Sequence, residues 1–404
     1  MFHYSFWLVV LAAVFAVAWL IQFILHLVVW QGALRQAGRQ ARTPLNNTDG
    51  EQPGVSVLVY SHNQAEALAR NLPVLLNQNY PKYEVIVLDD NSRDNTQDVL
   101  TMMDQRSDIL MHTKIDEKTR AMSHRKLAVL LGTKSAHYDL VLMTHAECMP
   151  ASADWIGGLV SHFANPGIEV VLGPVVYERR TGFLSRFCQF DLFQRLLLML
   201  GIALSVKAYA GWGQNLAFRK STFYANRSQG FQRHLKMQPG EDDLFVADVA
   251  RYGNVAVDCT PQTVMTDQSK PLFINWSIDR LNRGYTSRLY PWIPVVVKHL
   301  DYLTRYLTVI SGLILIVYAL MRIFNGGGSH QYAWITVGAV LAMLLIRITL
   351  IVFTHVRSAK ALKQHPMVAW PILCDLYTPF VDLWFRCKAL IYRKRFGVGK
   401  VGLY

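Results

Sequence analysis

Cysteine pairs and acidic residues are scarce in this 404-residue chain. The five cysteines are scattered and show no C-x-x-C spacing, which excludes a cysteine zinc site and a dithiol redox site, and predicts free thiols in a reducing compartment. Asp and Glu total 28 against 41 Lys and Arg, so the net charge is +13. No basic stripe interleaved with aromatic residues accompanies this excess, which argues against a nucleic-acid partner.

Charge is absent altogether from Phe6 to Trp30, a run long enough to cross a bilayer. Its flank lacks the basic cluster of a signal peptide, and no small-residue cleavage site follows, so we expect residues 1–30 to be a retained transmembrane anchor. Two more spans are expected at about 304–324 and 332–354, the second if Arg347 faces protein rather than lipid. The 52% hydrophobic content agrees with a membrane protein.

Basic residues predict the orientation of these spans. Arg35, Arg39 and Arg42 follow the first span, and further Lys and Arg residues follow the third, whereas the glycine-rich turn between the last two spans has almost none. By the positive-inside rule, the N-terminus is outside, and the part between the anchor and the last two spans is cytoplasmic, as is the tail. We therefore expect a multi-pass inner-membrane protein whose Lys and Arg residues meet anionic membrane lipids.

Four domains are expected. Residues 1–30 are the anchor, 31–53 a basic juxtamembrane linker, 54–298 a cytoplasmic catalytic domain, and 299–404 a membrane region that ends in interfacial helices and a basic tail. The run Leu196–Val206 is too short to span a membrane and is expected to be a core or surface-docking helix.

The expected catalytic domain alternates strand and helix patterns. Short β-branched apolar runs occupy 55–60, 84–89, 140–144 and 169–176, with helical apolar spacing between the first three. This order predicts an α/β fold with a mostly parallel sheet and helices on both faces. In such sheets ligands bind beyond the carboxyl ends of the strands.

Polar side chains follow three of these strands directly. They are Tyr60, Ser61, His62 and Asn63 after the first strand, Asp89, Asp90, Asn91 and Ser92 after the second, and His145 and Glu147 after the third. A single Asp pair after a strand is also typical of an Asx turn or a helix cap. Three such strand ends on one rim favour a ligand site.

The segment "VSVLVYSHNQAEALARNLPVLLNQNYPKYEVIVLDDNSRDNT" carries the patterns L-x-Q-x-Y-P and D-D-x-S-x-D-x-T. It resembles the nucleotide-binding half of the family 2 inverting glycosyltransferases. The resemblance extends from Pro53 to Arg288 through "SHRKLAVLLGTKSAHYDLVLMTHAECMP", "GWGQNLAFRKSTF" and "GEDDLFVADVARYG". It implies the GT-A fold and a nucleotide-diphospho-sugar donor, with a UDP-sugar as the first expectation.

The resemblance also implies roles for individual residues. Asp89 or Asp90 would contact the uracil and ribose, and Tyr60, Ser61 and Asn63 would complete the nucleoside pocket. Lys126 stands where the family often has a lysine, although a solvated surface position is the alternative. Gly213 and Asn215 belong to the G-x-N segment on the acceptor side. Where processive members have Q-x-x-R-W, "SIDRLNRGY" offers Arg280 as the donor contact, followed by Leu281 rather than Trp.

Acidic residues supply the expected chemistry. Asp242 matches the family's general base, with Glu241 as its neighbour, and the three adjacent acids can raise a carboxylate pKa by repulsion. Helix capping by Asp242 is an alternative that is compatible with this role. Glu147 aligns with the cation-binding aspartate of Asp-x-Asp, and His145 replaces the first aspartate. A divalent cation, Mg²⁺ or Mn²⁺, is expected, with a purely structural His145 as the alternative.

Three functions remain open at this point. The first is an inverting transferase that moves a sugar from a nucleotide-diphospho-sugar to a lipid-linked or membrane-proximal glycan acceptor in envelope or surface polysaccharide synthesis. The second is a processive synthase of the cellulose or poly-N-acetylglucosamine type, and the third is a catalytically weak subunit that binds a sugar nucleotide. The sequence indicates no oligomeric state and no partner subunit.

Overall fold

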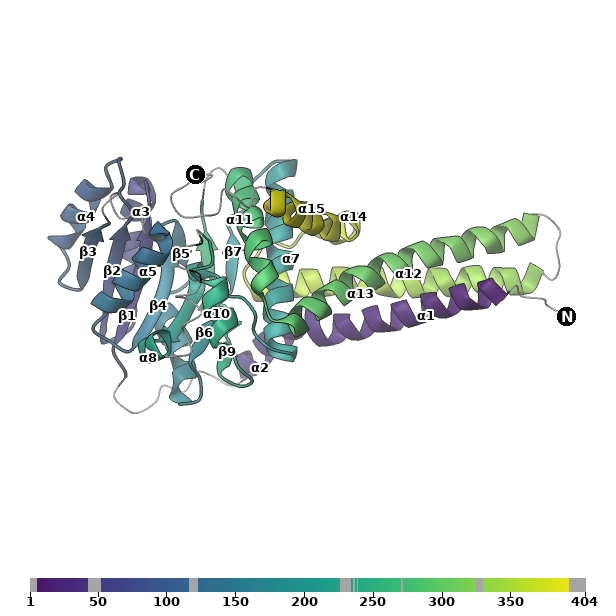
Figure 1. Ribbon diagram of the computed structural model, residues 1–404, viewed down its shortest axis with the longest axis horizontal. Coiled ribbons are helices and arrows are strands. Elements are labelled where there is room, and N and C mark those ends of the chain that lie inside the picture. The colour runs from purple at the N-terminus through teal and green to yellow at the C-terminus, as the bar shows by residue number, and fades with distance from the viewer. Residues whose placement is uncertain are drawn as a thin grey trace.

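A computed structural model describes residues 6–42, 52–115, 123–225, 234, 237, 239–269, 272–324 and 330–391. Figure 1 shows two parts, a layered α/β part and a bundle of long helices that projects from one side of it. Helices α7 (Phe183–Ser205) and α11 (Leu272–Thr286) stand between the two parts.

A seven-stranded sheet forms the centre of the α/β part, in the order β3-β2-β1-β4-β8-β6-β9. Its strands in chain order are β1 (Val55–Ser61), β2 (Tyr83–Asp89), β3 (Leu110–Lys114), β4 (Leu140–His145), β6 (Val170–Leu172), β8 (Leu216–Arg219) and β9 (Val255–Val257). β8 is antiparallel to both of its neighbours, and all other pairs are parallel. The predicted mixed, mostly parallel sheet is confirmed.

A second sheet of three strands joins β5 (Cys148–Pro150), β10 (Met265–Asp267) and β7 (Val175–Tyr177). The strand predicted over 169–176 is wrong in one respect, because the chain leaves the large sheet after Leu172 and enters the small one at Val175. Gly173 makes this crossing possible: a Cβ there would lie 2.4 Å from the side chain of Asn215. Pro174, which has no N–H to donate, then ends the ladder.

Short helices surround the sheets. They are α3 (Ala65–Leu75), α4 (Thr96–Asp104), α5 (His124–Ser135), α6 (Trp155–Val160), α8 (Lys220–Tyr224) and α10 (Asp243–Val249), with 3₁₀ turns η2 (Ser161–Ala164), η3 (Gly213–Asn215) and η5 (Ser287–Leu289). Helix α5 packs closely on the sheet at Gly132, where a Cβ would lie 2.6 Å from Leu88 and 3.0 Å from Leu58. This packing fixes the start of α5 beside the ends of β1 and β2.

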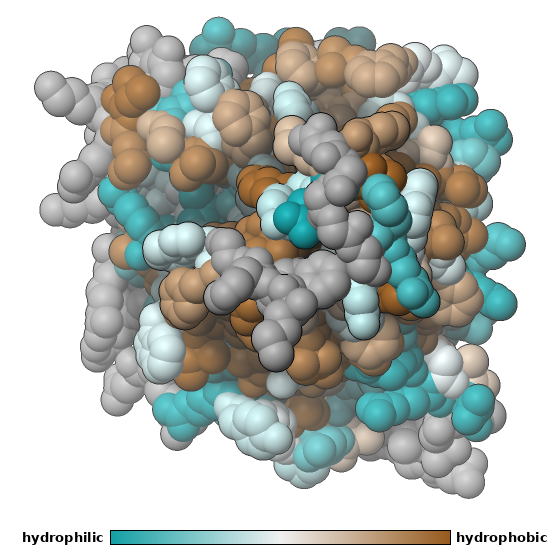
Figure 2. Space-filling model, turned by 90° about the vertical axis from the view of Figure 1, so that its right-hand side faces the viewer, coloured by the Kyte–Doolittle hydropathy of each residue, from teal (hydrophilic) through white to brown (hydrophobic). Residues whose placement is uncertain are grey.

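The bundle contains α1 (Phe6–Leu25), α12 (Trp292–Phe324) and α13 (His330–Ala361). Within the described residues, four helical segments are long and apolar enough to cross a membrane: these three, the first extended to Arg42, and α7. In the most apolar 18-residue stretch of α7, 78% of the residues are buried inside the protein, against 17–28% in the corresponding stretches of the other three. Seen along the bundle, apolar side chains occupy much of the middle of the molecule (Figure 2). The chain is therefore suited to association with a membrane.

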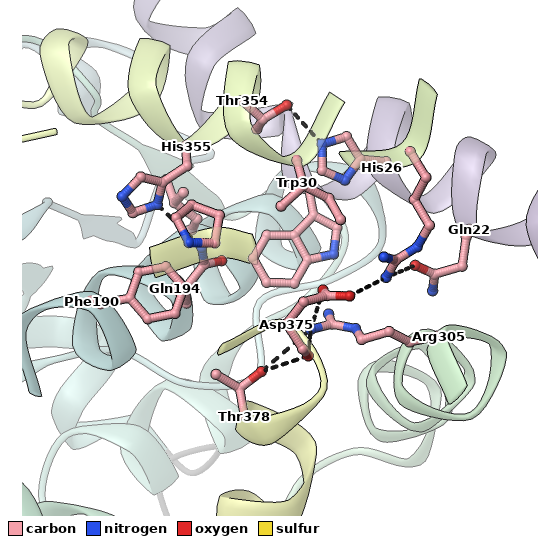
Figure 3. Close-up of a pocket in the computed structure, with 14 residues that line it drawn as sticks. Gln22, His26, Trp30, Phe190, Gln194, Arg305, Thr354, His355, Asp375 and Thr378 are labelled. Atoms are coloured by element: carbon pink, nitrogen blue, oxygen red, sulfur yellow. Dashed lines mark hydrogen bonds and ion pairs between the residues drawn. The ribbon is translucent and has the colours of Figure 1, made fainter. Parts of the chain in front are cut away.

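A group of polar residues, all buried except the partly buried Asp375, lies where the bundle meets the α/β part. This junction cluster consists of Gln22, Asp301, Arg305, Arg347 and Asp375. Arg305 lies 3.2 Å from Asp375 and also pairs with Asp301, and Arg347 lies 2.6 Å from Asp375. Several of these side chains point into one small space (Figure 3). Arg347 thus faces protein, as its span requires.

The first part of the expected linker and the described part of the tail contain helices, whereas residues 43–51 and the basic tail from residue 392 lie outside the described residues. A π-helical turn η1 (His26–Trp30) continues α1 into α2 (Gly32–Arg42), which lies within the expected linker 31–53. Gln40 of α2 donates to the carbonyl of Val257 at 3.2 Å and accepts from the N–H of Cys259 at 2.8 Å, so α2 is fastened to the α/β part. The tail forms α14 (Trp370–Cys374) and α15 (Tyr377–Ile391), and α15 packs against α11.

Candidate active site

The carboxyl ends of β1, β2 and β4 lie side by side at one edge of the large sheet. Ser61 is level with Asp89, and Tyr60 is level with His145 in the parallel ladders. The rings of Tyr60 and His145 have centroids 5.8 Å apart. The three polar strand ends identified in the sequence therefore form one rim.

The two adjacent aspartates after β2 have different surroundings, although both are buried. The Asp89 carboxylate accepts from the Ser92 N–H at 3.1 Å and from the Gln97 amide, so it shapes the turn after β2. Asp90 accepts from the Tyr60 hydroxyl at 2.5 Å and lies 2.7 Å from His124 Nδ1. Asp90 thereby joins the ends of β1 and β2 to the start of α5.

The loop after β1 is held by the same turn. Asn63 adopts the left-handed conformation at φ 51°, which asparagine tolerates better than most residues. Its N–H donates to Ser92 Oγ at 2.7 Å, and its side-chain oxygen accepts from the Arg93 N–H at 2.8 Å. Ser61 is buried, and its hydroxyl has no hydrogen-bond partner among the described residues. These contacts pre-shape the rim for a ligand.

Arg125 of α5 connects this rim to the acidic segment 241–243. Its guanidinium lies 5.2 Å from the centroid of the Tyr60 ring, and its Nη1 lies 3.5 Å from Glu241 Oε1. The other Glu241 oxygen is buried and has no hydrogen-bond partner among the described residues. A buried carboxylate oxygen without a partner is costly, which is typical of a site that binds a ligand.

Asp242 stands at the start of α10 and is shared by two other segments. Its Oδ1 accepts from the Asp243 N–H at 2.6 Å, so it caps the helix as the alternative interpretation predicted. Its Oδ2 accepts from the Gly213 N–H at 2.9 Å and lies 3.3 Å from the Arg283 guanidinium. Capping and a place in the cleft therefore coexist in one carboxylate.

Gly213 lies between Asp242 and the strand-end rim. A Cβ built on Gly213 would lie 3.4 Å from Asp242 Cβ and 3.6 Å from His145 Nε2. The strand end of β4 and the proposed base thus border the same space. Asn215 does not border this space. Its amide accepts from Trp155 Nε1 at 3.0 Å and donates to the carbonyls of Pro174 and Thr263 at 2.8 Å each. Asn215 is a buried link between the two sheets.

His145 and Glu147, the pair expected to hold a cation, lie near Asp267 of the neighbouring small sheet. His145 Nδ1 lies 3.4 Å from Glu147 Oε1. Burial by itself would raise the pKa of Glu147, but the hydrogen bond and charge of His145 hold that pKa below its ordinary value. Burial, and then the nearby Glu147 carboxylate, raises the pKa of Asp267 to about 6.

The donor set fits a cation that arrives with a phosphorylated ligand. Within the described part of the chain, no three His, Cys, Asp or Glu side chains are arranged to hold a metal by themselves. Mg²⁺ is commonly held by only one or two protein carboxylates together with substrate phosphates. Glu147, with His145 beside it, would supply the protein's share of such a site.

Lys126 is not the solvated surface residue that its isolated position in the sequence suggested. It is fully buried, and its ammonium donates to the carbonyls of His234 and, at 3.1 Å, Met237. Burial lowers the pKa of Lys126 to about 8, although the nearby carboxylates of Glu241, Asp243 and Asp242 act in the opposite direction. Lys126 holds the segment that leads into the acidic residues.

Arg280 lies away from the rim. It is buried between helices, where it pairs with Asp191 and lies 3.1 Å from Asp382 of α15. Arg283, one turn further along α11, reaches the site instead: it contacts Asp242 at 3.3 Å and covers the ring of Trp212 at 5.3 Å. The sequence contained a signal for the role of Arg283. In "RLNRG", Arg283 follows Arg280 by three residues, as Arg follows Gln in Q-x-x-R-W, so Arg283 occupies the Arg position of that motif and Arg280 the Gln position.

Asp243 makes the free energy of unfolding depend on pH. Burial, and then the Asp242 carboxylate, raises the pKa of Asp243 from 3.8 to about 6. The folded state therefore binds the proton more tightly than the unfolded state, so the free energy of unfolding falls as the pH rises from about 4 to about 6. Asp243→Asn should reduce this loss of stability between pH 4 and pH 6.

The test compares the thermal unfolding of the unmodified protein and of Asp243→Asn in detergent at pH 5 and pH 7. If the change in unfolding temperature between the two pH values is the same for both proteins, the prediction is contradicted.

Comparison with known proteins agrees with this geometry. Residues 56–225 match the family described as "Glycosyl transferase family 2". The chain carries a family 2 glycosyl transferase domain. Within the transferase domain lie the rim, Arg125 and Gly213, whereas Asp242 and Arg283 follow the matched residues.

Relatives of the transferase domain cover only part of the chain. Glycosyltransferase AglE of Haloferax volcanii is 27% identical over 132 residues, 32% of this chain and 42% of that protein. Chondroitin synthase of Pasteurella multocida is 28% identical over 126 residues, 31% of this chain and 12% of that protein. The chain thus spans less than half the length of these curated relatives.

A solved structure shares the fold of this chain over most of its length. The mannosyltransferase PcManGT from Pyrobaculum calidifontis, solved in complex with GDP-Man and Mn²⁺, aligns with a TM-score of 0.50 at 17% identity. The alignment covers 88% of this chain and 98% of that one. At this identity the likeness establishes the fold, which is the predicted GT-A fold.

Proposed function

We propose that this chain is a membrane-anchored inverting glycosyltransferase. It moves a sugar from a nucleotide-diphospho-sugar to a lipid-linked or membrane-proximal glycan in the synthesis of envelope or surface polysaccharide. The observation that carries the proposal is the meeting of Asp242 and His145 at Gly213. A base at Asp242 would stand beside the strand end where the diphosphate of the donor would lie.

The reaction follows from these positions. The acceptor hydroxyl attacks the anomeric carbon of the donor sugar, the bond from that carbon to the phosphate oxygen breaks, and the nucleoside diphosphate leaves. Asp242 takes the proton of the attacking hydroxyl. The Gly213 N–H and the Arg283 guanidinium both contact Asp242 Oδ2, and these two contacts fix the orientation of the carboxylate. One displacement from the opposite face inverts the configuration at the anomeric carbon.

The donor side is assigned to the rim. Tyr60, Ser61 and Asn63 with Asp89 and Asp90 would hold the nucleoside, and Arg125 lies between that pocket and Glu241. A divalent cation held by Glu147 would neutralise the charge that develops on the leaving diphosphate. Because PcManGT was solved in complex with GDP-Man, a donor screen should include GDP-sugars as well as UDP-sugars.

Transfer is expected to require a divalent cation and Glu147. The test supplies radiolabelled UDP- and GDP-sugars to membranes that contain the protein, with Mn²⁺, Mg²⁺ or chelator, and measures incorporation into lipid and glycan. Glu147→Gln, which keeps the side-chain size but removes the charge, should lower transfer about 10- to 100-fold. Glu169→Gln, far from the rim on the loop before β6, is the matched control. Transfer that is equal with chelator and in Glu147→Gln would contradict the assignment.

A processive synthase is the second candidate. It is favoured by Trp212, a buried aromatic residue whose ring is covered by Arg283, the same arginine that contacts Asp242, near where Q-x-x-R-W would otherwise supply a Trp. The length of the product made by purified protein separates the two functions: one or a few added sugars indicate the first candidate, and a long polymer indicates the second.

A further inference from the structure

The arginine beside the candidate base belongs to a row of alternating charges that leads away from the base. Arg283 contacts Asp242 at 3.3 Å, and its Nε donates at 2.7 Å to Asp279 Oδ1, one turn earlier in α11. The other oxygen of Asp279 lies 2.7 Å from Arg195 of α7, and Arg195 lies 3.4 Å from Asp191. The proposed reaction uses only the contact between Arg283 and Asp242, so the role of Asp279 is open.

Asp279 is the nearest counter-charge of Arg283. The two side chains are 2.7 Å apart, whereas Asp242 lies 3.3 Å and Asp243 4.0 Å from the same guanidinium. Burial by itself would lower the pKa of Arg283, but these three carboxylates hold it well above its usual range, and Asp279 contributes most. Arg283 is therefore shared, and the larger part of its charge is balanced by Asp279 rather than by Asp242.

Asp279 stays ionised while the protein works. Burial by itself would raise the pKa of Asp279, but the charges of Arg283 and then of Arg195 lower it to about 2. Each of its oxygens faces one of the two arginines, so Asp279 is not itself placed to take a proton from an acceptor. Its charge is a constant part of the surroundings of Asp242.

Trp212 connects Asp279 to the second partner of the candidate base. The buried ring of Trp212 is covered by both arginines that bind Asp279, and their guanidinium groups lie 5.3 Å and 5.9 Å from the ring centroid. Trp212 directly precedes Gly213, whose N–H donates to Asp242 Oδ2. Both contacts of that oxygen are thus supported from Asp279, one through an ion pair and the other through a packed ring.

Sharing the arginine matters for the strength of the base. A guanidinium beside a carboxylate stabilises its charged form and makes it a weaker base. A general base works best when its basicity matches the operating pH. Arg283 orients Asp242, and its full charge would also weaken that carboxylate as a base. Asp279 accepts from Nε and balances the charge, while Nη2 remains directed at Asp242.

We propose that Asp279 is a positioning residue for the transfer reaction. It holds Arg283 in place and balances its charge, so that Arg283 orients Asp242 without weakening it as a base. The proposal rests on the proposed function, since Asp242 is the base of that reaction. Asp279 lies beyond residues 56–225, which match the family.

The pH dependence of kcat tests the proposal. Initial rates are measured at saturating donor and acceptor over the pH range in which the protein stays folded. Asp279→Asn keeps an acceptor for Arg283 Nε but loses the charge, so we expect the acid limb of the profile to move to lower pH by about 0.5–1 unit. The plateau should fall about 2- to 5-fold, because the base is weaker. Asp279→Glu keeps the charge and should leave the limb in place.

Asp191→Asn is the matched control, because it removes the same charge one ion pair further from Asp242 and should leave the limb in place. The other titratable or charged groups around Asp242 come from its own segment, α5, α11 and β4 and are unchanged in these variants: Glu241, Asp243, Arg125, Lys126, Arg283 and His145. Because the pKa of Asp243 is raised to about 6, the shift is also measured in an Asp243→Asn background.

The outcomes separate this proposal from the proposed function. A limb that does not move in Asp279→Asn overturns it, even if less protein folds, because loss of folded protein lowers the rate at every pH without moving the limb. A limb that moves in Asp279→Glu, or moves equally in Asp191→Asn, overturns it as well. All three results leave the transferase function standing, because transfer has then been measured. Absence of transfer from every donor overturns both proposals.

Discussion

Asp242→Asn is expected to lower the rate of sugar transfer by about 10²–10⁴-fold, the usual range for loss of a general base. The amide keeps the shape of the carboxylate and can still accept from the Gly213 N–H, which donates to Oδ2 at 2.9 Å. It cannot take the proton of the acceptor hydroxyl. The loss should therefore appear in kcat, while the KM for the donor, which we propose binds at the strand-end rim, stays close to that of the unmodified chain.

The measurement is initial rates with the donor found in the screen, at saturating acceptor. Asp104→Asn makes the same chemical change on the exposed end of α4 and should leave the rate unchanged. Transfer by Asp242→Asn at near the unmodified rate would exclude this carboxylate as the base. If it also proceeded without a divalent cation, the weak binding-subunit function would become the better explanation.

Asp191→Asn is expected to destabilise the protein by about 3–5 kcal/mol, the range for removing one partner of a buried ion pair. Asp191 is fully buried in α7 and accepts from Trp276 Nε1 at 2.7 Å and from Arg280 Nε at 3.0 Å. It also lies 3.4 Å from Arg195. With the charge gone, the buried Arg280 guanidinium keeps only Asp382 as a counter-charge, and the polar attachment of α11 to α7 at Trp276 and Arg280 is weakened.

Thermal unfolding of the detergent-purified protein measures the effect. The double variant Asp191→Leu with Arg280→Leu should recover part of the loss, because replacing both partners of a buried pair by apolar side chains is often close to neutral. An Asp191→Asn protein as stable as the unmodified chain would mean that solvent reaches this pair. Because Arg280 belongs to this buried ion pair, Arg280→Leu should lower the free energy of unfolding and leave the KM for the donor nearly unchanged.

The rim was predictable because it depends on local pattern. Strand periodicity located β1, β2 and β4 within a residue or two, and parallel strands bring their carboxyl ends to one edge whatever the rest of the fold does. The position of Asp242 at a helix start was also visible, since Asp followed by an apolar run is a typical cap. These features need only neighbours in the sequence.

Roles that depend on distant partners were not predictable. Nothing near Lys126 in the sequence shows that two backbone carbonyls more than a hundred residues away close over its ammonium. Arg280 and Arg283 are one helical turn apart, and which of them reaches the site depends on how α11 rests on α7 and α15. Strand β9, only three residues long, takes its place from its neighbour β6 rather than from its own periodicity.

Helix α7 has a consequence for counting membrane crossings. A count by hydropathy gives four crossings, an even number, which would put both ends of the chain in one compartment. Because most of α7 is enclosed by protein, α1, α12 and α13 are the candidates left within the described residues, and an odd number of crossings would separate the two ends. Reporter fusions should therefore give opposite compartments for the N- and C-terminal ends, with the second reporter on the side of the transferase domain.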